Sequence, residues 1–275
     1  MLTFSYISKK QIILNLPLTT ESICTCIFVQ NSKMAEKITP YKDSKLGKKE
    51  QVTQMFDTIS ENYDGLNRVI SFGIDIKWRN IVVDILSKKQ PKNILDIATG
   101  TGDLAINMVK TGAEKIIGLD ISSGMLEVGK KKVAEKSLNH IIELVVGDSE
   151  NLPFEENTFD AITVAFGVRN FEDLEKGLSE IYRVLKKSGT FIVLETSVPT
   201  KTPYKQGYRF YTKNVLPLIG KLFSKDQSAY SYLSESASVF PHGKDFNNIL
   251  NKIGFIEVEN KPQTFGVASI YIATK

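Results

Sequence analysis

The sequence predicts an α/β fold whose mostly parallel sheet has seven strands and ends in an antiparallel hairpin. Two observations support this prediction. From residue 93 onward, short apolar segments alternate with segments of helical period, and the last two apolar segments are separated by only a few residues. Strands that alternate with helices are typical of a parallel sheet covered on both faces, whereas a short connection joins antiparallel neighbours. The chain of 275 residues is long enough for one such domain.

Seven segments have the length and apolar content of strands. Five precede the hairpin, at 93–98, 115–120, 141–146, 159–165 and 190–196, and two form it, at 255–260 and 267–274. Helices are expected over 103–111, from Ser122 or Ser123 to about Lys136, over 171–187 and over 245–253. Before the first strand, two helices joined near Phe72 and Gly73 are expected to cover the carboxyl edge of the sheet.

The first fifty residues differ in charge from the rest of the chain. They hold 8 Lys and 4 acidic residues, so they carry the whole net charge of +4 and leave 27 basic and 27 acidic residues elsewhere. A neutral body argues against nucleic-acid binding, which rests on neutralising phosphates. We predict a disordered leader and basic linker over 1–47 and one domain over 48–275, with a helical cover at 48–92 and a substrate-side insertion at 199–241.

The leader is the most ambiguous part of the chain. Residues 1–33 show neither a helical nor a strand period, so they are either a disordered leader or the product of a start codon upstream of the true one at Met34. Both cysteines lie in this segment, and the two histidines, His140 and His242, are far apart in sequence. We therefore expect no disulfide and no metal site in the body, which fits a reducing cytoplasm. No apolar run is long enough to predict a transmembrane helix.

A glycine-rich turn follows the first strand. Gly100, Gly102 and Ala105 match the spacing G-x-G-x-x-A. This spacing is typical of Rossmann-like nucleotide sites, because glycines let the backbone approach a ligand at the carboxyl edge of the sheet. The spacing alone fits an NAD-dependent dehydrogenase as well as a methyltransferase.

Three acidic residues favour S-adenosylmethionine over NAD as the bound nucleotide. Asp96 lies inside the first strand and could bind the ammonium group of the methyl donor, either directly or through loop amides and water. Asp120 ends the second strand, where a carboxylate can accept both ribose hydroxyls. Asp148 follows the third strand and can accept the adenine amino group, a position at which NAD folds do not ordinarily place an acid. Met125 is either an apolar wall for the adenine or part of the helix core.

Longer stretches resemble a known family. The segments "YDGLNRVISFGIDIKW" at 63–78 and "RVLKKSGTFIVLETS" at 183–197 resemble the two signatures of the UbiE/MenG family, and "FGVRNFED" at 166–173 also matches it. The similarity covers about 48–275 and implies the fold of class I S-adenosylmethionine-dependent methyltransferases. It further implies C-methylation of a reduced quinone, either 2-demethylmenaquinol in menaquinone biosynthesis or 2-polyprenyl-6-methoxy-1,4-benzoquinol in ubiquinone biosynthesis.

The resemblance also assigns residues to the methyl donor. It places Thr101 at the position of the family's donor-binding threonine, Asp120 at its ribose aspartate, and Asp148 with Ser149 at its adenine pair. Ala165 departs from the pattern, because some members have a donor-contacting serine there. This difference removes no donor anchor, because Asp96, Gly100, Gly102, Asp120 and Asp148 are all present, which argues against an inactive, methyltransferase-like binding protein.

The expected chemistry directs attention to the loop after the fourth strand. A ring carbon attacks a methyl group only when a neighbouring hydroxyl loses its proton, so a base or a group that stabilises the phenolate should lie beside the ring. Arg169 is the candidate for stabilising the phenolate, and Asn170 for orienting a hydroxyl or water. Arg169 could instead pair with an acid and order the loop. Asp64 is a further candidate base, beside Tyr63 in the helical cover, and His242 is a weaker one.

The implied substrate has a lipophilic polyprenyl tail. Apolar residues within 204–223 either line a groove for this tail, touch a bilayer surface or pack on the sheet. We expect a cytoplasmic enzyme that makes at most a transient contact with the inner face of the membrane. The resemblance leaves a homodimer open, and the chemistry requires no metal ion.

Overall fold

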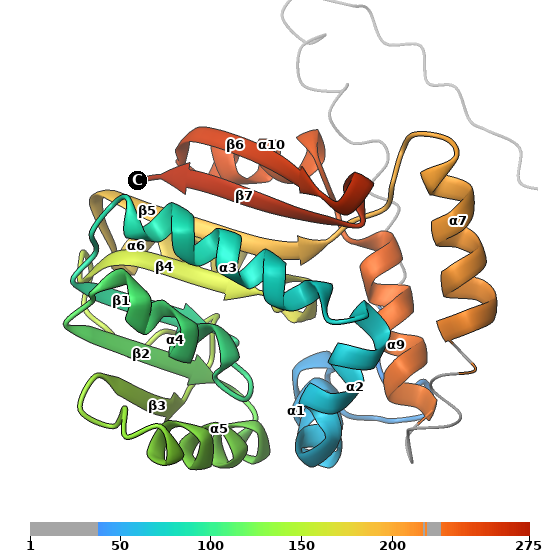
Figure 1. Ribbon diagram of the computed structural model, residues 1–275, viewed down its shortest axis with the longest axis horizontal. Helices are drawn as coiled ribbons and strands as arrows, with labels where there is room; N and C mark the ends of the chain where they lie inside the picture. The colour runs from blue at the N-terminus through green and yellow to red at the C-terminus, as the bar shows by residue number, and fades with distance from the viewer. Residues whose placement is uncertain (1–37, 217, 219–226) are drawn as a thin grey trace, which may run out of the picture. The chain divides into compact units, whose positions relative to one another are not determined.

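The computed structural model describes residues 38–216, 218 and 227–275, which form one compact unit. Its centre is a seven-stranded sheet in the order β3-β2-β1-β4-β5-β7-β6 (Figure 1). The strands are β1 (Asn93–Ile97), β2 (Lys115–Asp120), β3 (Ile142–Val146), β4 (Phe159–Ala165), β5 (Leu185–Thr196), β6 (Ile256–Gln263) and β7 (Ala268–Thr274). Strands β1 to β5 are parallel, and β7 pairs antiparallel with both β5 and β6. The predicted fold class is confirmed.

Helices cover both faces of this sheet. One face packs against α3 (Ile74–Ser87), α4 (Asp103–Met108) and α5 (Ser123–Glu135), and the other against α6 (Leu174–Val184) and α10 (Lys244–Ile253). The strands alternate between the two cores: Ile94 of β1 points to the first and Leu95 to the second. This alternation follows from the two-residue period of a strand and explains why the central strands are apolar throughout.

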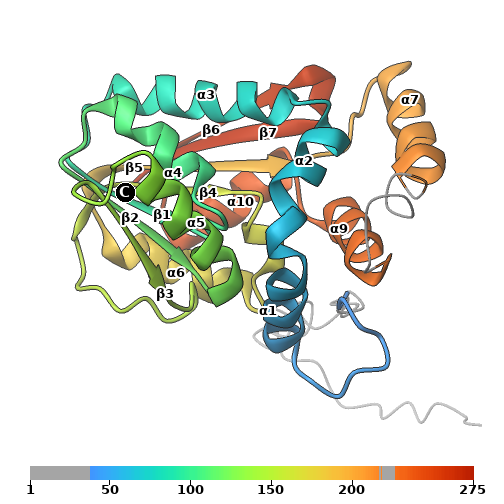
Figure 2. The same ribbon diagram turned by 60° about the horizontal axis from the view of Figure 1, so that its bottom comes forward.

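The remaining helices lie beyond the carboxyl ends of the parallel strands (Figures 1 and 2). They are α1 (Lys48–Ile59), α2 (Tyr63–Ser71), α7 (Tyr204–Phe210) with a π-helical extension at Tyr211–Val215, and α9 (Gln227–Val239). The turn expected between the two N-terminal helices is present, with Phe72 and Gly73 at φ values of 51° and 71°. Left-handed φ favours glycine, and it ends α2 so that the chain can reverse onto the sheet. The first expected helix is divided into α1 and α2 by a 3₁₀ turn at Ser60–Asn62, and the second, α3, packs on a face of the sheet and not at its carboxyl edge. Among the described residues, no helix has the length and apolar character needed to cross a bilayer.

Two element boundaries differ from the sequence prediction. The helix expected over 171–187 ends at Val184, because Leu185 already pairs with Phe159 of β4 ahead of a bulge. Strand β6 extends to Gln263, so only a 3₁₀ turn at Thr264–Gly266 connects it to β7. Both differences extend the sheet, since pairing partners that are distant in sequence decide where a strand begins and ends.

Residues 38–47 pack against α1. The Tyr41 amide donates to the Gln51 side chain at 2.9 Å, and the Gln51 amide nitrogen donates to the Leu46 carbonyl at 2.7 Å. Ile38 and Tyr41 pack against a small core that joins α1 to α5 and α9. The sequence places this segment in the linker, whereas the structure places it on the domain. The expectations for residues 1–37, including the leader and both cysteines, lie outside the described residues.

Candidate functional site

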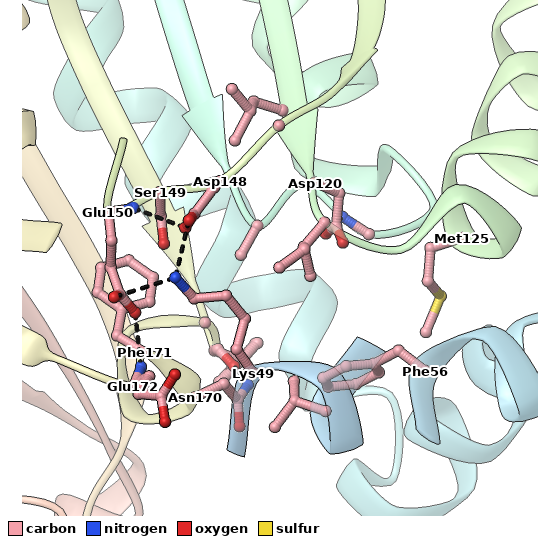
Figure 3. A pocket seen from close by; sticks show the side chains of 18 of the residues that line it. Lys49, Phe56, Asp120, Met125, Asp148, Ser149, Glu150, Asn170, Phe171 and Glu172 are labelled. Carbon is pink, nitrogen blue, oxygen red and sulfur yellow. Dashed lines mark hydrogen bonds and ion pairs between the residues drawn. The ribbon is translucent and has the colours of Figure 1, made fainter. Parts of the chain in front are cut away.

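A first cavity lies at the carboxyl ends of β1 to β4, under α1 (Figure 3). Each strand end contributes to its wall: Gly100 after β1, Asp120 at the end of β2, Asp148 with Ser149 after β3, and Ala165 at the end of β4. Parallel strands bring these positions to one edge, although they are far apart in sequence. Val52 and Phe56 of α1 and Met125 of α5 complete the wall with apolar side chains. Both positions considered for Met125 are combined in the structure, because its side chain lines the cavity and also belongs to the small core between α1, α5 and α9.

Asp120 orders the glycine turn at the base of the first cavity. Its carboxylate accepts hydrogen bonds from the Gly100 amide at 2.7 Å and the Ser122 amide at 2.9 Å. Gly100 has a φ of 58° and no atom within 4 Å of an added Cβ, so its backbone conformation rather than crowding requires glycine. Burial raises the pKa of Asp120 to about 6, although the backbone amides around it favour the charged form.

Asp148 is held by a lysine from the cover. Lys49 of α1 contacts the Asp148 carboxylate at 2.7 Å and the Glu150 carboxylate at 3.2 Å (Figure 3). Burial alone would lower the pKa of Lys49, but the hydrogen bonds to the two carboxylates raise it. An adenine amino group in this cavity would therefore donate to the Asp148 carboxylate while Lys49 contacts the same carboxylate.

Asp96 lies beneath the first cavity and is absent from its described lining. Its two oxygens accept from Thr99 at 2.6 Å and Thr163 at 2.5 Å, and only 1% of the residue is exposed. Burial raises its pKa to about 6, against the two threonine hydroxyls that favour the charged form. In this arrangement the Asp96 carboxylate fixes the start of the glycine turn through Thr99.

Thr101 and Gly102 also support the turn from outside the cavity lining. Gly102 caps α4 with a φ of 77°. The Thr101 hydroxyl donates to Asp64 of α2 at 2.6 Å, and Lys132 of α5 contacts Asp64 at 2.8 Å. Lys132 also pairs with Asp103, which in turn pairs with an arginine of α2. The network fastens the helical cover to the glycine turn.

A second cavity adjoins the first on the side of α2 and α7. Tyr63 and Phe166 line both cavities, so the two meet at these side chains. The surface of the second cavity is mostly apolar and aromatic, with Ile70, Trp78, Tyr208, Tyr211, Leu216, Leu233 and Val267 in its wall. Its polar groups include Asn67, Asp75, Arg79 and Arg169. Such a lining suits an apolar molecule that carries a small number of polar atoms.

Arg169 is one of two arginines that line the second cavity, with Arg79. It lies in the 3₁₀ turn after β4, and its Nη1 donates to the Glu195 carboxylate of β5 at 2.5 Å and to the Phe166 carbonyl at 2.8 Å. The side chains of Arg169 and Glu195 are only 7% and 0% exposed. Among the described residues, Arg169 Nε and Glu195 Oε2 have no hydrogen-bond partner. Burial alone would lower the pKa of Arg169, but Glu195 nearby raises it.

Of the other predicted catalytic residues, Asn170 lines a cavity, whereas Asp64 and His242 do not among the described residues. Asn170 lines the first cavity, and its Oδ1 accepts from the Tyr232 hydroxyl of α9 at 3.1 Å. Asp64 is in the lysine network described above and lines neither cavity among the described residues. His242 faces the Phe240 carbonyl at 3.3 Å and is likewise absent from both described linings. Only Arg169 and Asn170 therefore stay in contact with the cavities.

The described parts of the chain contain no group of three or more His, Cys, Asp and Glu side chains arranged as a metal site.

A family model for the ubiE/COQ5 methyltransferase family matches residues 44–275. The chain belongs to this family. It is a methyltransferase, as the resemblance of its two signature segments implies.

Relatives within the family have similar lengths. The demethylmenaquinone methyltransferase of Bacteroides fragilis is 49% identical over 242 residues, covering 87% of this chain and 98% of the relative. The ubiquinone/menaquinone biosynthesis C-methyltransferase UbiE of Geotalea daltonii is 44% identical over 230 residues, covering 83% and 97%. A solved structure of a possible histamine N-methyltransferase from Thermotoga maritima is 18% identical, with a TM-score of 0.55 over 81% of this chain and 99% of that one. At this identity, the structural likeness concerns the fold alone.

Three polar residues of this methyltransferase's site were missed by sequence reasoning. Glu195 could have been found from the sequence, because it is the single carboxylate in the apolar strand "TFIVLE", and a buried carboxylate is rarely without a cationic or hydrogen-bonding partner. Thr163 had a weaker signal of the same kind within β4. Lys49 had none, since it lies in a lysine-rich stretch that resembles a solvated linker.

Proposed function

We propose that this methyltransferase transfers a methyl group from S-adenosylmethionine to a ring carbon of 2-demethylmenaquinol. The observation that carries the proposal is the junction of the two cavities at Tyr63 and Phe166. One cavity has acidic groups at the ends of β2 and β3, and the other has a mostly apolar surface to which Arg169 and the Arg79–Asp75 ion pair contribute charged groups. A methyl group can pass between a nucleotide in the first and a quinol ring in the second only if both sites open to one another.

The first cavity would hold the donor through groups that the fold already positions. The Asp120 carboxylate would accept the ribose hydroxyls, and Asp148 with Ser149 would bind the edge of the adenine. Val52, Phe56 and Met125 would contact its faces. Asp96, Thr101 and Gly102 would act through the glycine turn, because their described contacts hold that turn rather than face the cavity.

The sulfonium of the donor supplies a strongly electrophilic methyl carbon. The chain's own task is to align the ring carbon with it and to favour loss of a quinol hydroxyl proton. A new carbon–carbon bond then forms, the carbon–sulfur bond breaks with its electrons passing to sulfur, and the ring carbon loses its proton. Arg169 would stabilise the phenolate, since it lines the second cavity and its contacts to Glu195 and Phe166 use Nη1.

Asn170 would orient a hydroxyl or water at the junction, where it lines the first cavity next to the Arg169 turn. Tyr63 separates the two cavities, and burial raises its pKa. The phenol of Tyr63 is therefore neutral at physiological pH and can donate a hydrogen bond to an oxygen in either cavity.

Comparing two acceptors tests the substrate assignment. Purified protein is incubated with methyl-labelled donor and either reduced demethylmenaquinone or a reduced 2-polyprenyl-6-methoxy-benzoquinone. Mass spectrometry then identifies the methylated products and measures their rates of formation. We expect a singly methylated naphthoquinol at the higher rate. Faster methylation of the benzoquinol would move the assignment to ubiquinone biosynthesis. Affinity for NAD without affinity for S-adenosylhomocysteine would overturn the donor assignment.

Donor affinity should depend on pH. In the proposed complex, the ionised Asp120 carboxylate accepts hydrogen bonds from both ribose hydroxyls. Because burial raises the pKa of Asp120 to about 6, the carboxyl must lose its proton before it binds the donor in this way. Affinity for S-adenosylhomocysteine should therefore fall as the pH decreases through this value, by about tenfold between roughly pH 7 and pH 5. Calorimetric titration at several pH values measures this dependence. The matched variant Asp120→Asn should bind weakly at every pH and lose most of the slope.

The cellular setting of the proposal follows from the acceptor. A polyprenylated quinol partitions into lipid, so we propose a cytoplasmic enzyme that meets the inner membrane face at its periphery. A homodimer is compatible with this setting, and sedimentation of the full chain would measure it.

A further inference from the structure

Exposed aromatic side chains lie on α7, at the end of α2 and in the β6–β7 turn, and those of Phe72, Tyr204 and Phe265 line one groove. Phe72, Phe265 and Phe210 are 79%, 67% and 65% exposed, and Tyr204 is also exposed. The Tyr204 and Phe265 rings stack at 4.1 Å, and the Phe72 ring lies 6.0 Å from that of Tyr211. Large exposed rings in contact with one another are unusual on a soluble protein and mark an interaction surface.

Cationic residues recur at a regular interval from just before α7 to its π-helical extension. Lys201, Lys205, Arg209 and Lys213 are four residues apart, and residues 197–218 contain no Asp or Glu. Residues four apart lie on neighbouring positions of one helix face, so Lys205, Arg209 and Lys213 form a stripe beside the groove-facing Tyr204, Tyr208 and Tyr211. All four cations are exposed, and none pairs with an acid among the described residues.

An apolar groove connects this surface with the interior. It is lined by the aromatic residues Phe72, Tyr204 and Phe265, and it shares Ile70, Trp78, Tyr208, Tyr211 and Val267 with the second cavity. The groove is therefore continuous with the cavity in which the quinol ring is proposed to bind. A long apolar tail attached to that ring would leave the protein between α7 and the end of α2.

We propose that the docking face, made of Phe72, Tyr204, Phe210, Phe265, Lys201, Lys205, Arg209 and Lys213, binds the surface of an anionic lipid bilayer. An apolar helix face with lysine and arginine beside it is the arrangement that lies in a lipid interface, with the rings among the acyl chains and the cations on the headgroups. This inference rests on the proposed function. With the docking face on the bilayer, the opening of the groove would lie at the lipid surface in which the polyprenylated quinol is dissolved.

Vesicle sedimentation of the full chain without substrate tests the docking face directly. The probes are vesicles of phosphatidylcholine alone and of phosphatidylcholine with phosphatidylglycerol. The chain should bind the anionic vesicles, less so as salt is added. The variant Lys205→Glu with Arg209→Glu should bind them about tenfold more weakly or worse. Phe210→Ser should also bind more weakly, at any salt concentration.

The matched control is Lys88→Glu with Lys89→Glu, which makes the same change of charge at the end of α3, away from α7 (Figure 1). This control should bind anionic vesicles like the unchanged chain. Equal losses in both charge variants, or no binding of anionic vesicles by the unchanged chain, would overturn the proposal. Binding to poly-glutamate but not to vesicles would assign the face to an acidic protein and also overturn it.

A second readout separates the docking face from the proposed function. Lys205 and Arg209 line neither cavity, so the doubly charged variant should methylate a short-tailed quinol in detergent at the normal rate. Normal vesicle binding with no methylation of any quinol would refute the proposed function alone. Normal methylation with unchanged vesicle binding in the variant would refute the docking face alone.

Discussion

Replacing Arg169 with alanine is expected to lower kcat by about 10²-fold or more, the scale seen when a preorganised stabilising group is removed. The reason is that the guanidinium acts on the phenolate, whose charge develops in the transition state, and not on the donor. Affinity for S-adenosylhomocysteine should therefore stay nearly unchanged, since Asp120 and Asp148 remain. Steady-state rates and calorimetric affinity, measured on one preparation, give both quantities.

The ion pair with Glu195 complicates this variant. Arg169→Ala leaves a fully buried carboxylate without its cation, and breaking a buried pair typically costs about 3–5 kcal/mol of folding stability. A second variant, Arg169→Ala with Glu195→Gln, removes both charges. If Arg169 acts on the substrate, the double variant should recover the melting temperature but not kcat. If the arginine only orders its loop, the double variant should recover both.

Arg169→Lys gives an independent check. A lysine keeps the positive charge beside Glu195 but lacks the planar fork that can bind the carboxylate and a phenolate together. We expect it to recover stability and only part of the rate. Near-normal turnover in Arg169→Ala would refute the catalytic role and direct attention to Tyr63 and Asn170.

Replacing Asp120 with alanine should weaken donor binding by roughly 2–3 kcal/mol, or about 30- to 150-fold, the scale of hydrogen bonds to a charged group. The variant loses the acceptor for the ribose and also the carboxylate that holds the Gly100 amide. Calorimetric titration with S-adenosylhomocysteine measures the effect, and the expected change in kcat at saturating donor is much smaller.

A matched control addresses the structural part of this effect. Asp160→Ala also removes a carboxylate that accepts two backbone amides, those of Lys92 and Asn93, at the opposite end of the sheet. It should leave donor affinity unchanged. Unchanged donor affinity in Asp120→Ala, or an equal loss in Asp160→Ala, would contradict the assignment of Asp120 to the ribose.

Local patterns predicted all seven strands and several of the positions that line the first cavity. Short apolar segments locate buried strands, and parallel pairing then brings their carboxyl ends to one edge, which is why Gly100, Asp120 and Asp148 could be expected from sequence to lie together. The turn at Phe72 and Gly73 was found for a similar reason, since a glycine after a helix favours a left-handed residue.

Pairings between distant side chains could not be predicted in the same way. Arg169 was identified, but its partner Glu195 lies 26 residues away on the next strand, and no spacing rule connects them. Asp64 was identified as a candidate base because of its position in the cover. The structure places it against Lys132 and Thr101 instead, and only tertiary packing determines which way that side chain turns.

The position of the transferred methyl group tests the account most directly. Protein, donor carrying a ¹³C-methyl group and reduced demethylmenaquinone are incubated together, and the product is examined by NMR. We expect the label on a carbon of the quinone ring, with S-adenosylhomocysteine formed in equal amount, and a much smaller yield with Arg169→Ala. A label on a quinol oxygen, or no transfer to the quinol, would contradict the account.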